Sequence, residues 1–332
     1  MKVVIPMAGF GKRLRPWTHS RPKPLINVAG KPVLAHVLDS LKGLEISELL
    51  CVTGYLGDQI EAFVQENYDI PSRFFVQEEL NGQSPAIHLC KDFLDGPCLI
   101  TFVDTIIRAD LSSLEDTRAD SIAFVQEIED PSRFGVAQLD NEGFVTRLVE
   151  KPEGSSSGNL VVVGFYYIKD GKKLISAIEY QLEHDIQTKG EYYLTDAFNI
   201  MLEQGSNMRT QTVDAWLDCG KSETVLETNR YLLDHGADNS DSVSFEDAIL
   251  IPPVQVHPSA LISRSVIGPH VAVGEGCRIE SSIISNSVVE PKAAIKAALI
   301  TDSIIGIDSS VEGRINTYHL GDTNSVFDAP DS

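Results

Sequence analysis

The sequence predicts an α/β protein in two parts, a mostly parallel sheet with helices on both faces and a C-terminal parallel β-helix. Over the first part, short β-branched runs alternate with amphipathic stretches, which is the pattern of a Rossmann-like sheet built from β-α-β units. Beyond residue 250, apolar residues recur every five or six positions, a period that fits neither a helix nor an alternating strand. The change of period separates two domains.

The first domain begins with a buried strand from Lys2 to Pro6, which runs into a glycine turn. Further strands are predicted at residues 49–53, 74–77 and 98–103, with helices between them, and the last of these strands stops at Asp104. Ligands bind beyond the carboxyl ends of parallel strands. We therefore expect the functional site in the loops after the first, third and fourth strands.

The middle of the chain is richer in strands. Residues 135–149 predict a hairpin around the turn from Asp140 to Gly143. The other predicted elements are a strand at 160–168, helices at 171–184 and 194–204, a strand at 212–217 that ends at Asp218, and a helix at 222–233. A polar, acidic stretch follows. We interpret residues 1–235 as the first domain, 236–250 as a linker, and 251–332 as the second domain with its tail.

The second domain carries the hexapeptide repeat typical of a left-handed parallel β-helix, in which each short strand forms one side of a triangular coil. The spacing predicts about three coils of roughly 18 residues. A sandwich of short strands is the alternative, but so many apolar positions in near-register favour the β-helix. These positions are Ile262, Ile267, Val273, Ile279, Ile284, Val289, Ile295, Ile300, Ile305 and Val311.

Charge and cysteine content restrict the function. The 332 residues carry a net charge of −21, which argues against broad binding to nucleic acid or to anionic membranes. The five cysteines are scattered, as expected of reduced thiols in a cytoplasmic protein. The sequence holds neither a long apolar run nor a signal-like N-terminus, so we expect neither a membrane span nor secretion.

Basic residues gather around the N-terminal glycine turn, Gly9 to Pro16, against this acidic background. Glycines let the backbone approach phosphates, and lysine and arginine side chains neutralise them. The turn is neither a dinucleotide fingerprint nor a Walker loop, because Leu14 replaces the third glycine of the fingerprint. Taken alone, it could also be a surface turn. The candidate nucleotide-binding residues here are Ala8, Gly9, Gly11, Lys12 and Arg13.

This turn and seven later segments resemble the sugar nucleotidyltransferase superfamily, in the family's order and rough spacing over about residues 1–235. The glycine turn is similar to the signature G-x-G-[ST]-R-L-x-P, which is followed by P-K-P-L at residues 22–25. The later segments are Gln77 with Gly82, Asp104, Phe134 to Val136, Val149 to Pro152, Gly164 to Tyr166, Glu191 with Leu194 to Asp196, and Trp216 to Gly220.

The resemblance implies a reaction in which a nucleoside triphosphate and a sugar 1-phosphate give a nucleotide sugar and pyrophosphate. It implies that Mg²⁺ binds to Asp104 and Asp218, that Arg13 binds the triphosphate, and that Lys23 contacts the reacting phosphate. Gln77 and Gly82 would select the nucleobase. The sugar phosphate would be held by Gly135, Glu150, Lys151 and Trp216. With phosphate as the nucleophile, neither a protein nucleophile nor a general base is needed.

Three residues depart from the family pattern. Lys12 stands where threonine or serine is usual, Thr105 follows the first acidic position, and Pro85 interrupts the glycine loop of the base pocket. These departures leave open a regulatory subunit that kept the fold and lost the chemistry.

Several further alternatives remain at this stage. Glucose 1-phosphate with dTTP is the first substrate hypothesis and UTP the second, while mannose 1-phosphate with GTP is the alternative. An acyltransferase activity in the β-helix would need a base histidine, for which His257, His270 and His319 are candidates by residue type. A structural β-helix is the simpler interpretation. The exposed ends of its coils favour a homo-oligomer.

Overall fold

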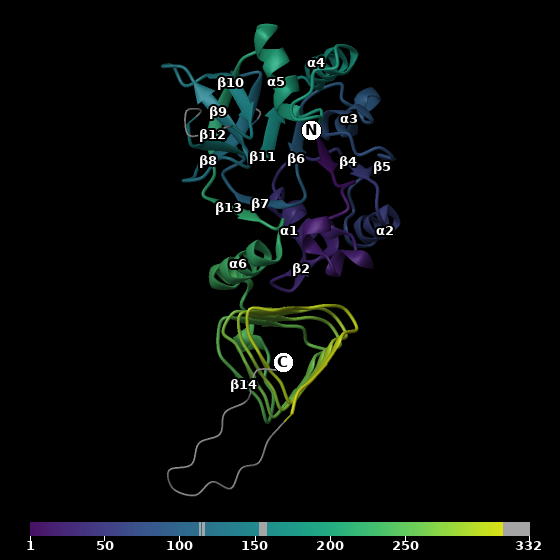
Figure 1. Ribbon diagram of the computed structural model, residues 1–332, viewed down its shortest axis with the longest axis vertical. Coiled ribbons are helices and arrows are strands. Elements are labelled where there is room, and N and C mark those ends of the chain that lie inside the picture. The colour runs from purple at the N-terminus through teal and green to yellow at the C-terminus, as the bar shows by residue number, and fades with distance from the viewer. Residues whose placement is uncertain (113, 115–116, 153–157, 315–332) are drawn as a thin grey trace, which may run out of the picture. The chain divides into compact units, whose positions relative to one another are not determined.

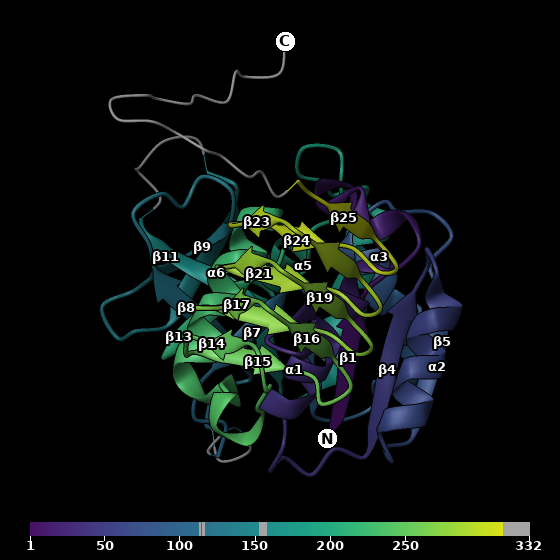
Figure 2. The ribbon, with the colours of Figure 1, turned by 90° about the horizontal axis from the view of Figure 1, so that it is seen from below.

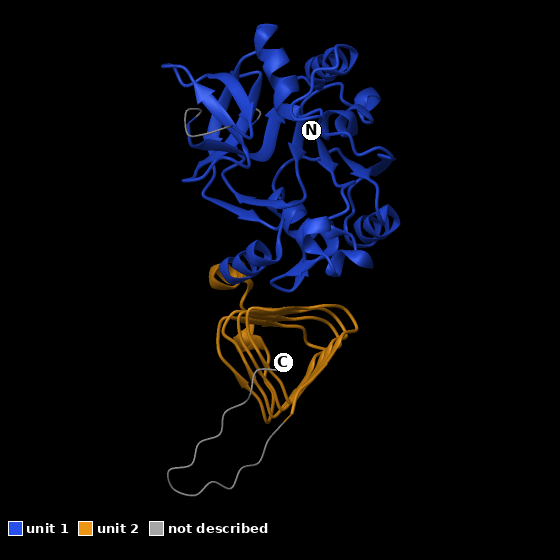
Figure 3. Ribbon diagram, in the orientation of Figure 1, with its two compact units in different colours: residues 1–231 blue, residues 232–332 orange. Residues whose placement is uncertain are grey.

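The computed structural model describes residues 1–112, 114, 117–152 and 158–314. The chain folds into two compact units, unit 1 (residues 1–231) and unit 2 (residues 232–332), which Figure 3 distinguishes by colour. Unit 1 is built on a nine-stranded sheet and unit 2 on stacked triangular coils (Figure 1). Both predicted architectures are therefore confirmed. Within the described residues, no helix combines the length and the apolar character needed to cross a bilayer.

One half of the large sheet is parallel and, apart from its edge strand, largely buried. β1 (Lys2–Pro6) lies between β4 (Glu48–Thr53) and β6 (Cys98–Thr101), and β5 (Ser72–Val76) extends the sheet beyond β4. All three pairs are parallel. Continuous runs of Val, Ile and Leu suit these strands because helices cover both of their faces.

The other half of the sheet is mainly antiparallel. β11 (Leu160–Ile168) pairs antiparallel with β6, β8 (Ser121–Glu127) and β9 (Gly135–Leu139), and β9 pairs with β10 (Val145–Glu150). The hairpin β9–β10 was predicted, whereas β8 and its parallel neighbour β12 (Met208–Thr212) were not. The prediction of one strand at 212–217 is wrong, because the chain turns between β12 and β13 (Ala215–Asp218) and enters a second sheet.

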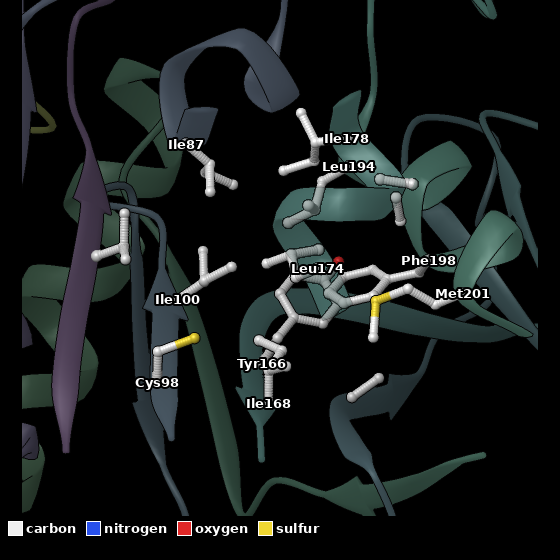
Figure 4. Packing of buried hydrophobic residues seen from close by; sticks show 14 of the residues in the cluster. Ile87, Cys98, Ile100, Tyr166, Ile168, Leu174, Ile178, Leu194, Phe198 and Met201 are labelled. Atoms are coloured by element: carbon white, nitrogen blue, oxygen red, sulfur yellow. The ribbon is translucent and has the colours of Figure 1, made fainter. Parts of the chain in front are cut away.

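Helices pack on both faces of the sheet. α1 (Val33–Ser40) and α2 (Gly57–Asn67) cover one face, where Val3 and Ile5 point. α3 (Gln83–His88), α4 (Gly171–Glu183) and α5 (Leu194–Glu203) cover the other face, where Val4 points. Figure 4 shows this second core, with Phe198 and Met201 of α5 against Tyr166 of the sheet. Because side chains alternate along a strand, the β-branched residues of β1 contact the helices on both faces of the sheet.

A small two-stranded sheet lies beside the large one. β7 (Thr105–Arg108) pairs antiparallel with β13, and α6 (Ser222–Leu232) follows β13. The pairing places Asp218 opposite Thr105. Unit 1 also contains β2 (Asn27–Val28), β3 (Lys31–Pro32), and short 3-10 turns at Lys12–Leu14, Trp17–His19, Lys23–Leu25 and Lys91–Phe93.

Unit 2 contains three parallel four-stranded sheets, an arrangement consistent with a left-handed β-helix. Figure 2 shows its coils stacked one on another. The first sheet is β14 (Ile249–Leu250), β17 (Val266–Ile267), β20 (Ile283–Ile284) and β23 (Leu299–Ile300). The second is β15 (Val254–Val256), β18 (Val271–Val273), β21 (Ser287–Val289) and β24 (Ile304–Ile305). The third is β16 (Leu261–Ser263), β19 (Arg278–Glu280), β22 (Ala294–Lys296) and β25 (Ser310–Glu312).

Up to residue 314, where the described part of the chain ends, four coils are present where about three were expected. Val254 stands opposite Val271, and Val271 opposite Ser287, so a coil takes fewer residues than the predicted spacing. The first coil also begins with β14, inside residues 236–250, the segment interpreted as a linker. That segment further contains a 3-10 turn, Ser240–Ser242, and follows the π-helical turn Leu233–Ala237. Its polar composition concealed the first strand of the β-helix.

One corner of the β-helix leaves no room for a side chain and another does, which gives a direct test. A Cβ added to Gly268 would lie 1.9 Å from the carbonyl oxygen of Ile251, whereas one added to Gly276 would meet nothing nearer than 3.7 Å. Both residues have positive φ. We predict that Gly268→Ala destabilises unit 2 by about 3 kcal/mol, and that Gly276→Ala costs only about 1 kcal/mol, the strain of the backbone conformation. Hydrogen exchange of the amides of residues 249–312 in the full chain measures both; equal effects would contradict the steric explanation.

Candidate active site

The N-terminal glycine turn is folded back onto the segment that carries Lys23. Gly11 has φ = +61°, and a Cβ added there would lie 3.0 Å from the side chain of Thr18 and 3.1 Å from Cβ of Lys23. The Thr18 hydroxyl donates a hydrogen bond of 2.9 Å to the carbonyl oxygen of Gly11. Only glycine combines that conformation with such a close approach. The turn therefore holds its backbone next to Lys23.

Lys23 forms an ion pair with Asp104, which lies just beyond the end of β6. The distance from Lys23 Nζ to Asp104 Oδ2 is 2.6 Å, and the two side chains are 14% and 33% exposed. Burial acts to raise the pKa of Asp104, but Lys23 and Arg13 outweigh it and hold that pKa below its ordinary value. Asp104 is therefore ionised at neutral pH although it is largely shielded from water.

Backbone hydrogen bonds bring the second acidic residue to the same place. The N–H of Cys219 donates to the carbonyl oxygen of Asp104 at 2.9 Å, and the N–H of Gly220 donates to Asp218 Oδ1 at 2.8 Å. A Cβ added to Gly220 would lie 2.8 Å from Asp218 Oδ1 and 3.3 Å from a terminal nitrogen of Arg13. Asp218 and Arg13 therefore flank Gly220, although the two aspartates are 114 positions apart in sequence.

Two adjoining clefts meet at these residues. The glycine-turn cleft, of about 290 Å³, is lined by Gly9, Gly11, Lys12 and Lys23. The larger cleft, of about 560 Å³, is lined by Gly135, Glu150, Lys151, Trp216 and Asp218. Both clefts include Arg13, Phe102 and Asp104 in their walls. A ligand in one cleft would thus lie directly beside a ligand in the other.

Glu150 is fixed in the wall of the larger cleft. Thr195 donates a hydrogen bond of 3.2 Å to Glu150 Oε2, and a Cβ added to Gly135 would lie 3.2 Å from the same oxygen. Burial raises the pKa of Glu150, and Lys151 opposes that shift only partly. A carboxylate beside a glycine backbone can accept hydrogen bonds from the hydroxyl groups of a sugar.

Lys151 and Trp216 complete that wall. Lys151 Nζ donates to the hydroxyl of Tyr193 and lies 4.4 Å from the centre of its ring. Trp216 packs edge-to-face against Phe134, with ring centres 4.8 Å apart. Its indole Nε1 is buried and has no hydrogen-bond partner among the described residues. These aromatic rings give the cleft a rigid apolar floor beside its charged groups.

The residues predicted for the nucleobase meet each other but do not line either of these clefts. Gln77 Nε2 donates to the carbonyl oxygen of Gly82 at 3.1 Å. Gly82 has φ = +135°, and a Cβ there would lie 2.4 Å from the carbonyl oxygen of Tyr192. Ala8 is buried and packs against Gly54, while Lys12 Nζ lies 5.5 Å from the centre of the Phe10 ring.

Sequence reasoning missed three basic residues that line the larger cleft, Arg133, Lys189 and Lys221. Lys189 Nζ donates to the backbone oxygen of Lys151 at 3.0 Å. Each of the three directly adjoins or lies two residues before a segment that the resemblance had marked. A search for basic residues flanking those segments would have found them. Together with Arg13 they make this cleft cationic in an acidic protein.

The donor set fits Mg²⁺. Two aspartates from neighbouring strand ends converge, and Mg²⁺ commonly binds one or two carboxylates together with waters and phosphate oxygens. Across the described parts of the chain, no cluster of three or more His, Cys, Asp or Glu residues is arranged to hold a metal. A structural zinc site of four protein ligands is therefore not the kind of site these residues form.

Comparison with known proteins gives two family matches. Residues 2–235 match the family model described as nucleotidyl transferase, and residues 237–312 match a GlmU-like C-terminal hexapeptide model. The chain is 32% identical to the low-salt glycan biosynthesis nucleotidyltransferase Agl11 of Haloferax volcanii, with 94% of each chain covered.

A further relative and a solved structure are also similar to this chain. The chain is 28% identical to a glucose-1-phosphate thymidylyltransferase of Streptomyces griseus, over all of this chain and 95% of that protein. A structure of UDP-glucose pyrophosphorylase complexed with UDP-glucose shares the fold, with a TM-score of 0.62 and 19% identity, covering 70% of this chain and 98% of that one.

The ion pair makes a measurable prediction about Asp104. In Lys23→Met, burial of Asp104 is no longer offset by the neighbouring ammonium, so the pKa of Asp104 should rise. Since a depressed carboxyl pKa contributes stability that is lost as pH falls through it, the variant should also lose less stability on acidification. Carbon-detected NMR titration of the carboxyl group measures the pKa. Lys12→Met, whose ammonium faces Phe10, serves as control, and an unchanged Asp104 pKa in Lys23→Met would contradict the prediction.

Proposed function

The chain belongs to the nucleotidyl transferase family and is a nucleotidyltransferase, and from this premise we propose that it joins a nucleoside triphosphate to a sugar 1-phosphate. The observation that carries the proposal is the shared wall of the two clefts. Arg13 and Asp104 belong to both, with Lys23 on the glycine-turn side and Asp218 on the other. Such a wall suits a reaction between two phosphate-bearing substrates.

In the proposed arrangement the triphosphate occupies the glycine-turn cleft and the sugar phosphate the larger one. Gly9, Gly11 and Lys12 face the triphosphate, and Arg13 neutralises the β- and γ-phosphates. Glu150 accepts hydrogen bonds from the sugar, and the backbone N–H of Gly135 donates one to it. Lys151 and Trp216 contact the sugar from the side. Gln77 and Gly82 are proposed to read the base.

The chemical step is then an in-line displacement at the α-phosphorus. An oxygen of the sugar 1-phosphate forms a bond to the α-phosphorus, the bond to the bridging oxygen of the β-phosphate breaks, and pyrophosphate leaves with that electron pair. Because the attacking phosphate is already ionised, no proton has to be removed. Arg13 and Lys23 neutralise the charge that builds up on the phosphate oxygens.

Asp104 and Asp218 are the residues proposed to hold Mg²⁺, which when bound would neutralise phosphate oxygens and orient them. The Lys23–Asp104 ion pair keeps Asp104 ionised and therefore ready to bind a cation. The hydrogen bond from the Gly220 N–H fixes the direction of the Asp218 carboxylate, and the bond from the Cys219 N–H to the backbone oxygen of Asp104 holds the two acidic segments together. Both acids are thus oriented before any ligand arrives.

Glucose 1-phosphate with dTTP is the proposed substrate pair, with UTP as the second nucleotide. The similarity to a glucose-1-phosphate thymidylyltransferase supports the first pair, and the 31% identity to UTP–glucose-1-phosphate uridylyltransferase AglF of Haloferax volcanii supports the second. Mannose 1-phosphate with GTP stays as the alternative.

Two other classes of function have less support than this reaction. An inactive regulatory subunit would tolerate the departures at Lys12, Pro85 and Thr105. An active enzyme is supported by the walls of the two adjoining clefts, which include Arg13, Lys23, Asp104 and Asp218. An acyltransferase would need a base histidine. Of the candidates, His257 hydrogen-bonds Ser259 and His270 pairs with Asp234, each at 2.8 Å, while His319 lies outside the described residues.

We propose that the β-helix has a structural role, that the protein is cytoplasmic, and that it forms a homo-oligomer through unit 2.

The substrate hypothesis predicts the outcome of a pyrophosphate-release panel. With glucose 1-phosphate, mannose 1-phosphate and each common nucleoside triphosphate in the presence of Mg²⁺, glucose 1-phosphate with dTTP should react fastest, followed by UTP. Fastest release with mannose 1-phosphate and GTP would overturn the substrate pair. No release with any pair would favour the regulatory subunit.

Substitutions beside the shared wall should lower turnover strongly without unfolding the chain. We predict that Asp218→Asn and Lys23→Ala each lower kcat by about 100-fold or more, because each removes charge stabilisation of the transition state. Lys42→Ala is the matched control, since Lys42 is an exposed lysine of unit 1 whose ion pair with Asp39 lies away from both clefts. Steady-state kinetics and circular dichroism measure both effects, and near-normal turnover in either cleft variant would refute its role.

A further inference from the structure

The first turn of α3 is tied by hydrogen bonds to the segment that leads into α5. The backbone N–H groups of Gln83 and Ser84 both donate to the carbonyl oxygen of Tyr192, at 3.0 and 3.1 Å. Ser84 is fully buried, and its hydroxyl donates to the carbonyl oxygen of Tyr193 at 3.2 Å. These bonds fix the backbone of Gln83 at the larger cleft, which Gln83 lines.

A backbone N–H group orients the side-chain amide of Gln83. The N–H of Leu194 donates to Gln83 Oε1 at 3.2 Å, and Leu194 is itself held in the core together with Ile87 of α3 (Figure 4). Because an N–H group needs an oxygen as its acceptor, the NH2 group of Gln83 takes the other side of the amide. Gln83 is partly exposed, and this NH2 group makes no hydrogen bond within the described residues. It is therefore a donor that a ligand in the cleft can use.

Glu150 is held close to this amide by the next residue of α5. Thr195, which directly follows Leu194, donates to Glu150 Oε2 at 3.2 Å. The larger cleft is lined by both Gln83 and Glu150. One offers a donor and the other an acceptor, and a hydroxyl group can accept from the first and donate to the second. The two side chains therefore form a complementary pair for the hydroxyl groups of a sugar.

The charge of the surroundings decides which part of a ligand the amide meets. The cations that line the larger cleft include Arg13, Lys151 and Lys221. Ionised donors bind phosphate more strongly than a neutral amide does. The phosphate of a ligand is therefore drawn to those cations, and the amide is left for the neutral oxygens of the sugar.

We propose that Gln83 is a specificity-determining residue, whose NH2 group donates a hydrogen bond to one hydroxyl oxygen of the sugar phosphate in the larger cleft. This inference rests on the proposed function, because it takes the sugar phosphate as the ligand of that cleft. A sugar that lacks this oxygen would leave the NH2 group without a partner in the complex, and would react more slowly for that reason. Gln83 would thus contact the sugar together with Glu150 and Gly135.

The test compares the wild type with Gln83→Met, which keeps a side chain of similar length and removes the amide. Pyrophosphate release is measured with the most reactive substrate pair of the wild type, and then with each monodeoxy analogue of that sugar 1-phosphate. Gln65→Met is the matched control, because Gln65 is an exposed glutamine of α2 whose amide bonds to Glu61. Circular dichroism of the full chain checks the fold of each variant.

We expect Gln83→Met to lower kcat/KM for the intact sugar 1-phosphate by about 10-fold or more. For one monodeoxy analogue the wild type should fall to the level of Gln83→Met, because neither complex then contains the hydrogen bond. Gln65→Met should match the wild type throughout. An equal loss in Gln83→Met for the intact sugar and for every analogue would show that Gln83 only supports the fold, and would overturn the proposal, as would no loss at all.

A second variant separates the two halves of the amide. Gln83→Glu keeps an oxygen for the N–H of Leu194 and removes only the NH2 group. It should fold as the wild type does and still lose about 10-fold or more in kcat/KM with the intact sugar. Wild-type activity in Gln83→Glu would overturn the role of Gln83 alone, whereas a wild type that releases no pyrophosphate with any substrate pair would overturn the proposed function and this inference together.

Discussion

The ion pair between Lys23 and Asp104 is the interaction on which the arrangement of the site depends. It joins the glycine-turn region of the N-terminus to the end of a strand 81 positions later. Without a cation beside it, a shielded carboxylate would tend to become protonated; with Lys23 it stays charged. On its other side, Lys23 packs against the backbone of Gly11. One pair thus links the glycine turn to the segment after β6 and sets the charge of Asp104.

The sheet topology makes this pair possible. β1 and β6 are parallel neighbours, so their carboxyl ends lie at one edge, and the loops that leave them carry the glycine turn and Asp104. β13 reaches that edge from another direction, through its antiparallel pairing with β7, and brings Asp218 with it. Three segments far apart in sequence therefore meet where the two clefts join.

Much of the fold and part of the site were predictable from the sequence. The parts that were missed were missed for a physical reason. The parallel strands and the β-helix were predicted because their apolar periodicity follows directly from burial. β8 and β12 were missed because their place in the sheet depends on pairing with β11 and with each other, which a local pattern does not reveal. The meeting of Asp104 and Asp218 was anticipated only through family resemblance. Lys189 and Lys221 were overlooked because each lies just outside a segment that the resemblance marks, and it is the fold that places them in the cleft.

The stacked coils of unit 2 have a consequence for how such chains can vary. Every inner coil pairs only with the coil before it and the coil after it, through strands of two or three residues. Duplication or loss of one coil would change the length of the stack and leave the pairing rules of the remaining coils as they were. The height of this domain is therefore a modular quantity, open to stepwise evolution independently of the sheet that carries the chemistry.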